Sequence, residues 1–572
     1  MSEKDRAGKG HKTRTAAGAA APPQRPPSAA TRMTGGQALV ESLKIQGVEV
    51  LFGLPGVQLD GAFDALWEAR DAIRVYHTRH EQAASYMADG YARTTGRVGT
   101  CLVVPGPGIL NAASGLSTAY ACSAPVLCIA GQIPFKSIGR GAGMLHEIPD
   151  QLIAARSFTK WAGLAERPED VPGVVREAFR QLRSGHVRPV SVEVPQDTLQ
   201  NSGEVVLSAR VEPERESGDP DAIEAAAERL GRAERPVIFT GGGVLRSGAW
   251  TSLERLAEML EAPVIMSSSG RGAISDRNYL AQTMVAGPEL LPPADVVLVV
   301  GTRFLQPAQS GWRPRADQTV IQIDVDRDEI GRNCAVTAGI VGDADVVLQD
   351  LLSRIPRHNR RRASRREECE AVRRKVEEAL GALEPQRSYA HAIRDALPED
   401  GIVVSGVTQL GYWIQFGTFP IYRPRTLITP GYQGTLGYEY GTALGAQVGA
   451  PKQRVVAICG DGGFMYQVQE LATAVLHRIN AIAIVFNDGA FGNVRRMQEQ
   501  LYGGHVIASD LYNPDFMKLA DAFGVRGLRA DGPDGLRTQL AAALRDDAPA
   551  LIEVPVGPMP FPWPVIRPGM ER

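Results

Sequence analysis

The chain has 572 residues, of which 44% are hydrophobic and 22% charged, and a net charge of −2. This length exceeds what one hydrophobic core supports and predicts about three domains. The near-neutral charge gives no reason to expect binding to nucleic acid or to an anionic membrane, and no apolar run is long enough to span a bilayer. The six cysteines form no Cys-x-x-Cys pair, so we expect buried free thiols and a cytoplasmic location.

The N-terminal part of the chain predicts a tail followed by a first domain. Residues 1–32 are rich in Ala, Pro, Lys and Arg and lack the apolar core of a secretory signal, so they predict a disordered tail. Residues 33–205 predict an α/β domain, because apolar segments such as 100–104 and 125–129 alternate with helical patterns such as 81–94.

Two further domains follow. A polar stretch at 212–219 precedes a predicted central domain, residues 216–355, with strand candidates at 236–240, 296–301 and 319–324. The basic segment 357–375 falls in a predicted linker, residues 356–387, as a solvated loop or helix. Residues 388–572 predict the third domain. We expect an α/β fold in which all three domains are doubly wound parallel sheets, the central one Rossmann-like.

The third domain carries two aspartates at the ends of neighbouring predicted strands. The apolar segment 455–459 ends at Gly460-Asp461-Gly462, a helical pattern covers 465–477, and the apolar segment 481–486 ends at Asn487-Asp488. A right-handed strand–helix–strand crossover makes the two strands parallel. Both aspartates then lie at the carboxyl ends of strands, where open α/β sheets bind ligands.

These residue types suit a magnesium ion that carries a diphosphate. Mg²⁺ takes one or two carboxylates and completes its octahedron with phosphate oxygens and water. Glycine lets the backbone approach a phosphate closely, and a helix that starts near Gly463 presents free N–H groups to the same anion. Gly-Asp-Gly alone is often only a turn, but a second aspartate at the matching strand end favours a metal–diphosphate site.

The segment 460–494 resembles the cofactor motif of thiamine diphosphate enzymes, in their acetolactate synthase-like branch of large, catalytic subunits. The resemblance implies that Asp461, Asp488 and the backbone carbonyl of Ala490 hold Mg²⁺. Many members have Asn at the position of Asp488, and either residue offers an oxygen ligand. The same resemblance places further residues of this segment beside the cofactor, namely Gly460, Gly462, Gly463 and Phe491.

Other motifs match the same family in the same order along nearly the whole chain. They are the segments 51–56, 79–84, 87–93, 105–108, 131–134 and 434–437. The resemblance assigns the family's essential glutamate to Glu81, which would face the aminopyrimidine ring and activate the cofactor by hydrogen bonding. It also implies a wedge under the cofactor at Leu436 and cofactor contacts at Gly56, Gln409 and Gly434. Domains one and three, which bind the pyrimidine and the diphosphate, are then expected to be related in fold.

The substrate side is less well defined. Gln132 is a candidate substrate contact by resemblance, and His80 and His146 are candidates for proton transfer because histidine titrates near neutrality. Acetolactate synthases carry a Gln-Trp pair that shapes the acceptor site, whereas this chain has Arg496 and Met497 there. Met497 is therefore a candidate substrate contact in an altered wall.

The central domain raises the question of FAD. The segments 241–243, 301–304 and 324–326 could line a nucleotide cleft, although no complete Gly-x-Gly-x-x-Gly is present. Acetolactate synthases bind FAD in this domain and carry an acidic, Arg-containing run that residues 305–309 replace here. The difference argues against FAD, and the sequence leaves the question open.

The resemblance implies a carboligase or lyase that depends on thiamine diphosphate and Mg²⁺. It would decarboxylate pyruvate or a similar 2-oxo acid and add the resulting enamine to a second carbonyl. The close alternative is a 2-oxo acid decarboxylase or a C–C bond-cleaving lyase or hydrolase, and the distant one is a non-catalytic regulatory subunit. The family builds its site between domain one of one subunit and domain three of another, so we expect a homodimer or homotetramer.

Overall fold

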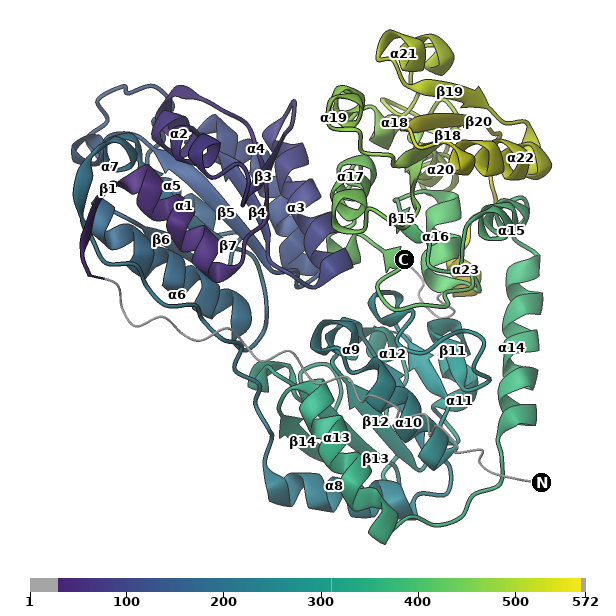
Figure 1. Ribbon diagram of the computed structural model, residues 1–572. Helices are drawn as coiled ribbons and strands as arrows, with labels where there is room; N and C mark the ends of the chain where they lie inside the picture. Colours follow the sequence, from purple (N-terminus) through teal and green to yellow (C-terminus); the bar gives the residue numbers. More distant parts are fainter. Residues whose placement is uncertain (1–28, 310, 567–572) are drawn as a thin grey trace, which may run out of the picture.

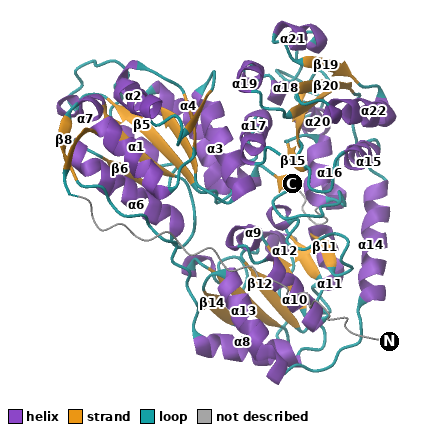
Figure 2. Ribbon diagram, in the orientation of Figure 1, coloured by secondary structure: helices purple, strands orange, loops and turns teal. Residues whose placement is uncertain are grey.

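The computed structural model describes residues 29–309 and 311–566, which form three six-stranded parallel sheets in succession (Figure 1). Figure 2 shows the strands of each sheet enclosed by helices. The predicted fold class is therefore confirmed. In the described residues, no helix is both long enough and apolar enough to cross a membrane.

Domain one begins earlier than the sequence pattern indicates. Residues 1–28 of the expected tail lie outside the described residues. β1 (Thr31–Thr34) pairs antiparallel with β8 (Ser202–Val205), so Thr31 and Arg32 belong to the fold and not to the tail. The four residues of β1 have mixed polarity and show no strand pattern of their own. Their pairing partner, β8, lies at the far end of the domain sequence, where no local pattern reports it.

The sheet of domain one has helices on both faces. α3 (Glu81–Thr95) and α4 (Pro107–Ala121) share one buried cluster with the sheet, and α1 (Gly35–Gln46) and α6 (Val171–Arg183) share the other. The strand order is β3 (Arg74–His77), β2 (Val50–Gly53), β4 (Gly99–Val103), β5 (Val126–Gln132), β7 (Val190–Pro195), β6 (Trp161–Leu164). The helices are α1 (Gly35–Gln46), α2 (Asp60–Glu68), α3 (Glu81–Thr95), α4 (Pro107–Ala121), α5 (Gln151–Arg156), α6 (Val171–Arg183) and α7 (Gln196–Gln200).

The central domain has the strand order typical of dinucleotide-binding folds. Its sheet runs β11 (Ala281–Thr283), β10 (Val264–Met266), β9 (Val237–Thr240), β12 (Val296–Val300), β13 (Thr319–Asp324), β14 (Ala338–Val341). Numbered within the domain, this order is 3-2-1-4-5-6. Its helices are α8 (Pro220–Arg232), α9 (Gly242–Ser247), α10 (Trp250–Leu260), α11 (Gly287–Leu290), α12 (Leu305–Gln309) and α13 (Ala344–Arg354).

The predicted linker is largely one long helix, α14 (Arg366–Gly381), which leads from the central domain to domain three along one side of the molecule (Figure 1). Arg366, Arg374 and Lys375 are exposed, whereas Cys369, Val372, Val376 and Leu380 recur at helical spacing and are buried. The segment therefore packs as an amphipathic helix, which is the second of the two forms expected for it.

Domain three repeats the strand order of domain one, 2-1-3-4-6-5 within each domain, which confirms their relationship in fold. The sheet runs β16 (Leu427–Ile428), β15 (Ile402–Ser405), β17 (Val455–Gly460), β18 (Ile482–Asn487), β20 (Ala550–Pro555), β19 (Arg526–Arg529). Its helices are α15 (Gln386–Ala396), α16 (Gln409–Phe416), α17 (Glu439–Gly449), α18 (Asp461–Phe464), α19 (Glu470–His477), α20 (Gly492–Leu501), α21 (Phe516–Ala522), α22 (Gly532–Arg545) and α23 (Trp563–Ile566).

Domains one and three pack through α3 and α17, which approach each other at two glycines. A Cβ atom on Gly90 would lie 2.0 Å from the carbonyl oxygen of Thr442, and one on Gly445 would lie 1.9 Å from that of Met87. Any side chain at either position would force the helices apart. These two glycines therefore fix how the two sheets stand relative to each other.

Candidate active site

The two predicted aspartates lie side by side at the carboxyl edge of the sheet in domain three. β17 and β18 are parallel neighbours, with Gly460 opposite Phe486. Asp461 is the first residue of α18, and Asp488 follows β18 directly. The strand–helix–strand prediction is confirmed for both strands and for their parallel pairing.

The helix between these strands differs from the prediction. Residues 465–469 form turns, so the expected helix over 465–477 starts only at Glu470, and the helix expected near Gly463 starts at Asp461. The reason is a tertiary contact. Glu470 is fully buried and accepts hydrogen bonds from the backbone N–H of Arg79, and Gln467 donates to Gln82. Both partners belong to domain one, where no local pattern reports them.

The two aspartates differ in exposure: Asp461 is buried, whereas Asp488 is exposed. Asp461 is 2% exposed, and burial raises its pKa. Partial desolvation, followed by the charge of Asp461, raises the pKa of Asp488 to about 6. Within residues 29–309 and 311–566, neither carboxylate forms an ion pair. A buried carboxylate such as that of Asp461 is costly without a counter-charge, and the carboxylate of Asp488 lies beside it, so the donor set fits a divalent cation that one oxygen of each aspartate ligates.

The loop after β18 folds back over the same place. Gly489 N–H donates to Oδ2 of Asp461 (3.0 Å), and Ala490 N–H donates to Oδ1 of Asp488 (3.2 Å). Ala490 is buried, and Phe491 N–H donates to the carbonyl of Ser509 (2.8 Å). The structure thus brings the two aspartates and Ala490 together, as the three-ligand prediction requires.

One residue of this cluster, Asn513, was not predicted from the sequence. The side-chain amide of Asn513 donates both to Oδ2 of Asp461 (2.6 Å) and to Oδ1 of Asn487 (2.9 Å). Asn487 belongs to the motif, but Asn513 follows a long loop and has no motif of its own. It holds the Asp461 carboxylate in place without adding a charge.

Beside the aspartates the backbone forms a narrow cradle. A Cβ atom on Gly462 would meet the ring of Phe491 at 2.6 Å, and one on Gly463 would meet Leu436 at 3.3 Å. The side chain of Gln409 lies at the start of α16 and donates weakly to Asn493, while its buried Oε1 has no partner among the described residues. A cofactor with hydrogen-bond donors could satisfy that oxygen. Of the other predicted cofactor contacts in domain three, Gly460 is the N-cap residue of α18 and directly precedes Asp461, and Gly434 is an exposed glycine with φ 58°.

A second group of predicted residues lies at the carboxyl edge of the sheet in domain one. Glu81 is the first residue of α3 and is 8% exposed, and Asn111 of α4 donates to its Oε2 (3.0 Å). Gly108 lies against the same carboxylate. Gly56 follows β2, and a Cβ atom there would lie 2.3 Å from Val104. In this single chain, Glu81 and the aspartate pair therefore have separate sets of neighbours.

The four candidate substrate residues differ in their surroundings. His80 is the N-cap residue of α3, where its Nδ1 accepts from Gln82 N–H (3.2 Å), a structural use of the ring. His146 has φ 69° and a buried Nδ1 without a partner among the described residues. Gln132 is buried and donates to Glu193 (3.1 Å). Met497 is half-buried on α20.

Glu193, under Gln132, is a buried acid that the sequence did not single out. It is 1% exposed, and burial raises its pKa to about 7. Because this pKa lies above the usual unfolded value, the folded protein holds an extra proton at pH 5 to 6. Ionisation of Glu193 therefore costs stability, and the cost grows as the pH rises from the unfolded pKa to about 7 and is complete above it.

The variant Glu193→Gln should therefore be more stable than the parent protein at pH 8, by an amount of up to about 3 kcal/mol, and no more stable at pH 5. Gln offers Gln132 the same acceptor oxygen without the charge. Thermal unfolding at both pH values measures the effect, with exposed Glu204→Gln as the control. Equal gains at pH 5 and pH 8 would contradict the charge explanation.

Comparisons with known proteins agree with this geometry. The family models of thiamine pyrophosphate enzymes match in all three parts: the N-terminal TPP binding domain at residues 33–153, the central domain at 223–351 and the C-terminal TPP binding domain at 406–554. The two sites described above lie in the two TPP binding domains.

Three relatives illustrate the range of the similarity. A probable acetolactate synthase large subunit of Methanocaldococcus jannaschii is 33% identical over 570 residues, which cover 94% of each chain. An acetolactate synthase of Arthrospira platensis is 32% identical and covers 95% of this chain and 98% of its own. A probable 2-ketoarginine decarboxylase of Pseudomonas aeruginosa is 35% identical over 534 residues, 91% of this chain and 94% of its own. The chain belongs to the thiamine diphosphate-dependent enzymes, in their acetolactate synthase-like branch.

Proposed function

We propose that the protein is a Mg²⁺- and thiamine diphosphate-dependent carboligase that decarboxylates a 2-oxo acid such as pyruvate and joins the remaining fragment to a second carbonyl compound. The observation that supports this most strongly is the pair of adjacent carboxylates at the carboxyl edge of the sheet in domain three, where Asp461 is buried and neither Asp461 nor Asp488 forms an ion pair in the described residues. When bound, thiamine diphosphate supplies a nucleophilic carbon and an electron sink for the loss of CO₂.

Each group of residues has a distinct part in this proposal. Asp461, Asp488 and the carbonyl of Ala490 would hold Mg²⁺, and the backbone N–H groups of Gly462 and Gly463 would face the diphosphate. Leu436, in contact range of Gly463, would support the cofactor from below. Glu81 would hold and return a proton at the aminopyrimidine ring, in a pocket that excludes most water.

A decarboxylase without carboligation is the second candidate, for two reasons. The acceptor wall of acetolactate synthases is altered here, since Arg496 lies over the ring of Phe561 and its guanidinium donates to the carbonyl of Met559. In addition, the Pseudomonas aeruginosa relative is named a probable 2-ketoarginine decarboxylase. Release of the aldehyde after proton transfer would then replace the second carbonyl addition.

A product assay separates the two candidates. Purified protein with thiamine diphosphate and Mg²⁺ is supplied with pyruvate or 2-ketoarginine, and CO₂ and products are followed by mass spectrometry. Acetolactate from pyruvate is the expected result for the carboligase, and an aldehyde as the sole organic product supports the decarboxylase. If the loaded protein releases no CO₂ from these or a wider panel of 2-oxo acids, the proposal is wrong.

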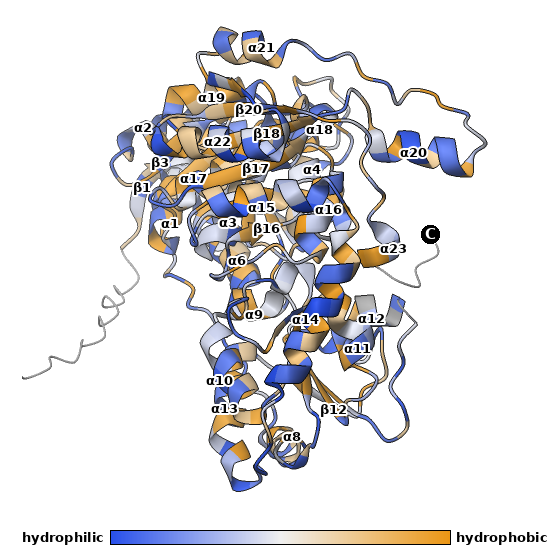
Figure 3. Cartoon of the chain, turned by 90° about the vertical axis from the view of Figure 1, so that its right-hand side faces the viewer, coloured by the Kyte–Doolittle hydropathy of each residue, from blue (hydrophilic) through white to orange (hydrophobic). Residues whose placement is uncertain are grey.

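We also propose a homodimer or homotetramer in which Glu81 of one subunit meets the aspartate pair of another. Large exposed apolar side chains accompany both groups, including Leu110 beside Asn111 and Leu145 beside His146. Tyr512, next to Asn513 in the sequence, is 99% exposed. Figure 3 shows α20, which has no buried residue, standing apart from the sheets. A second subunit would cover such surfaces.

Mixed dimers test this arrangement. Glu81→Gln and Asp461→Asn proteins are each expected to be nearly inactive, but co-expression should restore up to about a quarter of wild-type activity, because half of the statistical dimers are mixed and each holds one intact site. Mixing Glu81→Gln with Glu81→Gln carrying a second tag is the control. No recovery in isolated mixed dimers would place both residues of a site in one chain.

FAD is not part of the proposed chemistry. The segments predicted to line a nucleotide cleft do meet at a cavity of about 1010 Å³ between the domains, which includes Gly242, Gly301 and Asp324 in its wall. Residues 305–309, which replace the acidic, Arg-containing run of acetolactate synthases, form α12. Its end residues Leu305 and Gln309 also line this cavity. The absorbance spectrum of the purified protein reports directly whether a flavin is bound.

A further inference from the structure

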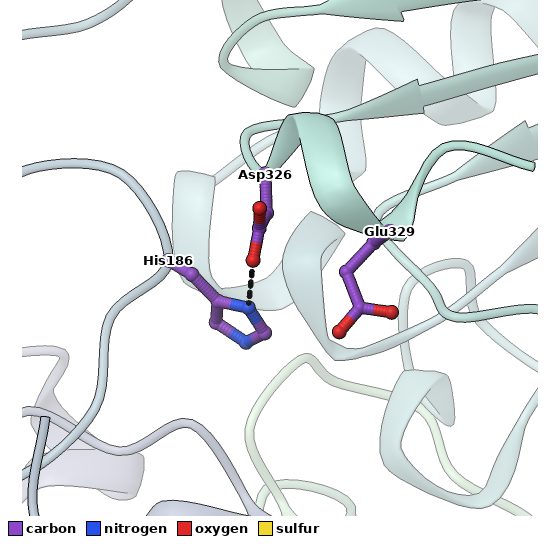
Figure 4. A group of neighbouring side chains, drawn as sticks. All are labelled: His186, Asp326 and Glu329. Carbon is purple, nitrogen blue, oxygen red and sulfur yellow. Dashed lines mark hydrogen bonds and ion pairs between the residues drawn. The ribbon is translucent and has the colours of Figure 1, made fainter. Parts of the chain in front are cut away.

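We propose that His186, Asp326 and Glu329 form a second divalent-cation site, which joins domain one to the central domain. His186 lies in the loop between α6 and β7 of domain one, whereas Asp326 and Glu329 lie in the turn that follows β13 of the central domain (Figure 4). The site is far from the aspartate motif in sequence and belongs to neither TPP binding edge.

The three side chains converge on one point. One nitrogen of His186 and one oxygen from each carboxylate all lie within 4.8 Å of one another. His186 Nδ1 and Asp326 Oδ2 are already 3.1 Å apart. Bonds of about 2.1 Å to a tetrahedral zinc ion place two ligand atoms about 3.4 Å apart, so this pair has the spacing of two ligands on one metal. The Glu329 oxygen lies within 4.8 Å of both of these atoms, so a bound metal would draw it closer to them.

Glu329 supplies an independent reason to expect a cation. Its side chain is 2% exposed, and its Oε2 has no hydrogen-bond partner among the described residues. Its other oxygen accepts from Arg332 (3.2 Å), whose side chain is 61% exposed. The carboxylate points toward the imidazole ring of His186 (Figure 4). A buried carboxylate oxygen aimed at a neutral ring gains nothing from it, whereas a metal ion between them would satisfy both.

The second ring nitrogen of His186 is held in the way that metal-binding histidines usually are. Nε2 lies 2.9 Å from the hydroxyl of Ser123. If Nε2–H donates to that hydroxyl, the Nδ1 lone pair faces Asp326 and Glu329 and can bind a metal. The metal-free alternative is that Ser123 donates to Nε2 and Nδ1–H donates to Asp326. That alternative leaves Oε2 of Glu329 without a partner among the described residues.

The donor set indicates which ions suit the site. One imidazole nitrogen and two carboxylate oxygens favour Zn²⁺ or another first-row divalent ion, whereas Mg²⁺ prefers an all-oxygen set. The aspartate pair in domain three is such an all-oxygen set, so the two sites should select different ions. His186 and Glu329 also line the interdomain cavity, from which water can complete the coordination.

The test is a zinc titration of protein whose magnesium site is already filled. Tag-free protein is stripped with a chelator and dialysed into saturating Mg²⁺ and thiamine diphosphate. Zn²⁺ is then titrated by calorimetry, and thermal unfolding is measured with and without Zn²⁺. We expect one additional Zn²⁺ per chain and a rise in the unfolding temperature.

Variants decide whether the binding is at this site. His186→Ala and Glu329→Gln should each weaken Zn²⁺ binding at least tenfold and abolish the rise in unfolding temperature. Asp328→Asn, an exposed carboxylate in the same turn, should behave like wild type. Glu329→Gln keeps the size of the side chain and an oxygen that can accept from Arg332, so it should fold as well as wild type without zinc. Absence of the extra ion in wild type, or equal binding in both variants, would overturn the proposal.

Discussion

Replacing Glu81 by Gln is expected to lower turnover by at least about 100-fold while the fold and the binding of Mg²⁺ and thiamine diphosphate remain intact. Gln has the same shape and keeps an oxygen to accept from Asn111, which donates to Glu81 at 3.0 Å. It cannot hold and return a proton. Glu81 is the first residue of α3, where loss of its charge costs a helix only about 0.3–1 kcal/mol.

Three measurements on the Glu81 variant separate chemistry from binding. CO₂ release at saturating substrate gives turnover, calorimetry gives the affinity for thiamine diphosphate in the presence of Mg²⁺, and thermal unfolding reports on the fold. Glu49→Gln, a glutamate of the same domain with 61% side-chain exposure, is the matched control. Turnover near wild type in Glu81→Gln would show that this carboxylate has no catalytic part.

The architecture could be predicted because its signals are local. Fully buried strands such as β12 and β18 read as short apolar runs, and the Gly-Asp-Gly and Asn-Asp turns mark where two of them end. Once those strands are parallel neighbours, the meeting of Asp461 and Asp488 follows from topology alone.

The features that escaped prediction depend on partners distant in sequence. The turns at 465–469 exist because Glu470 and Gln467 bind residues of domain one. Burial raises the pKa of Glu439 to about 7, yet its sequence neighbours give no sign that the side chain is enclosed. Burial of a polar side chain is a property of the assembled core, so periodicity within one segment cannot report it.

The metal proposal leads to a contrast between two conservative variants. Asp461→Asn should weaken binding of Mg²⁺ and thiamine diphosphate at least tenfold, because one carboxylate oxygen becomes an N–H₂ group that repels a cation. Asp488→Asn should bind within a few-fold of wild type, since an amide oxygen there can still ligate. Neither change should destabilise the cofactor-free protein, because each relieves repulsion between the buried carboxylate of Asp461 and the adjacent carboxylate of Asp488.

Thermal unfolding with and without cofactor measures this contrast directly. A ligand present at a hundredfold over its Kd stabilises a protein by about 2.7 kcal/mol, so wild type and Asp488→Asn should both gain stability on loading. Asp461→Asn should gain little or none, although its cofactor-free form unfolds no earlier than wild type. If both variants lose the gain equally, total negative charge governs loading and not the position of Asp461, which Asn513 and Gly489 hold by hydrogen bonds at 2.6 and 3.0 Å. If neither loses it, the cation does not bind at this pair.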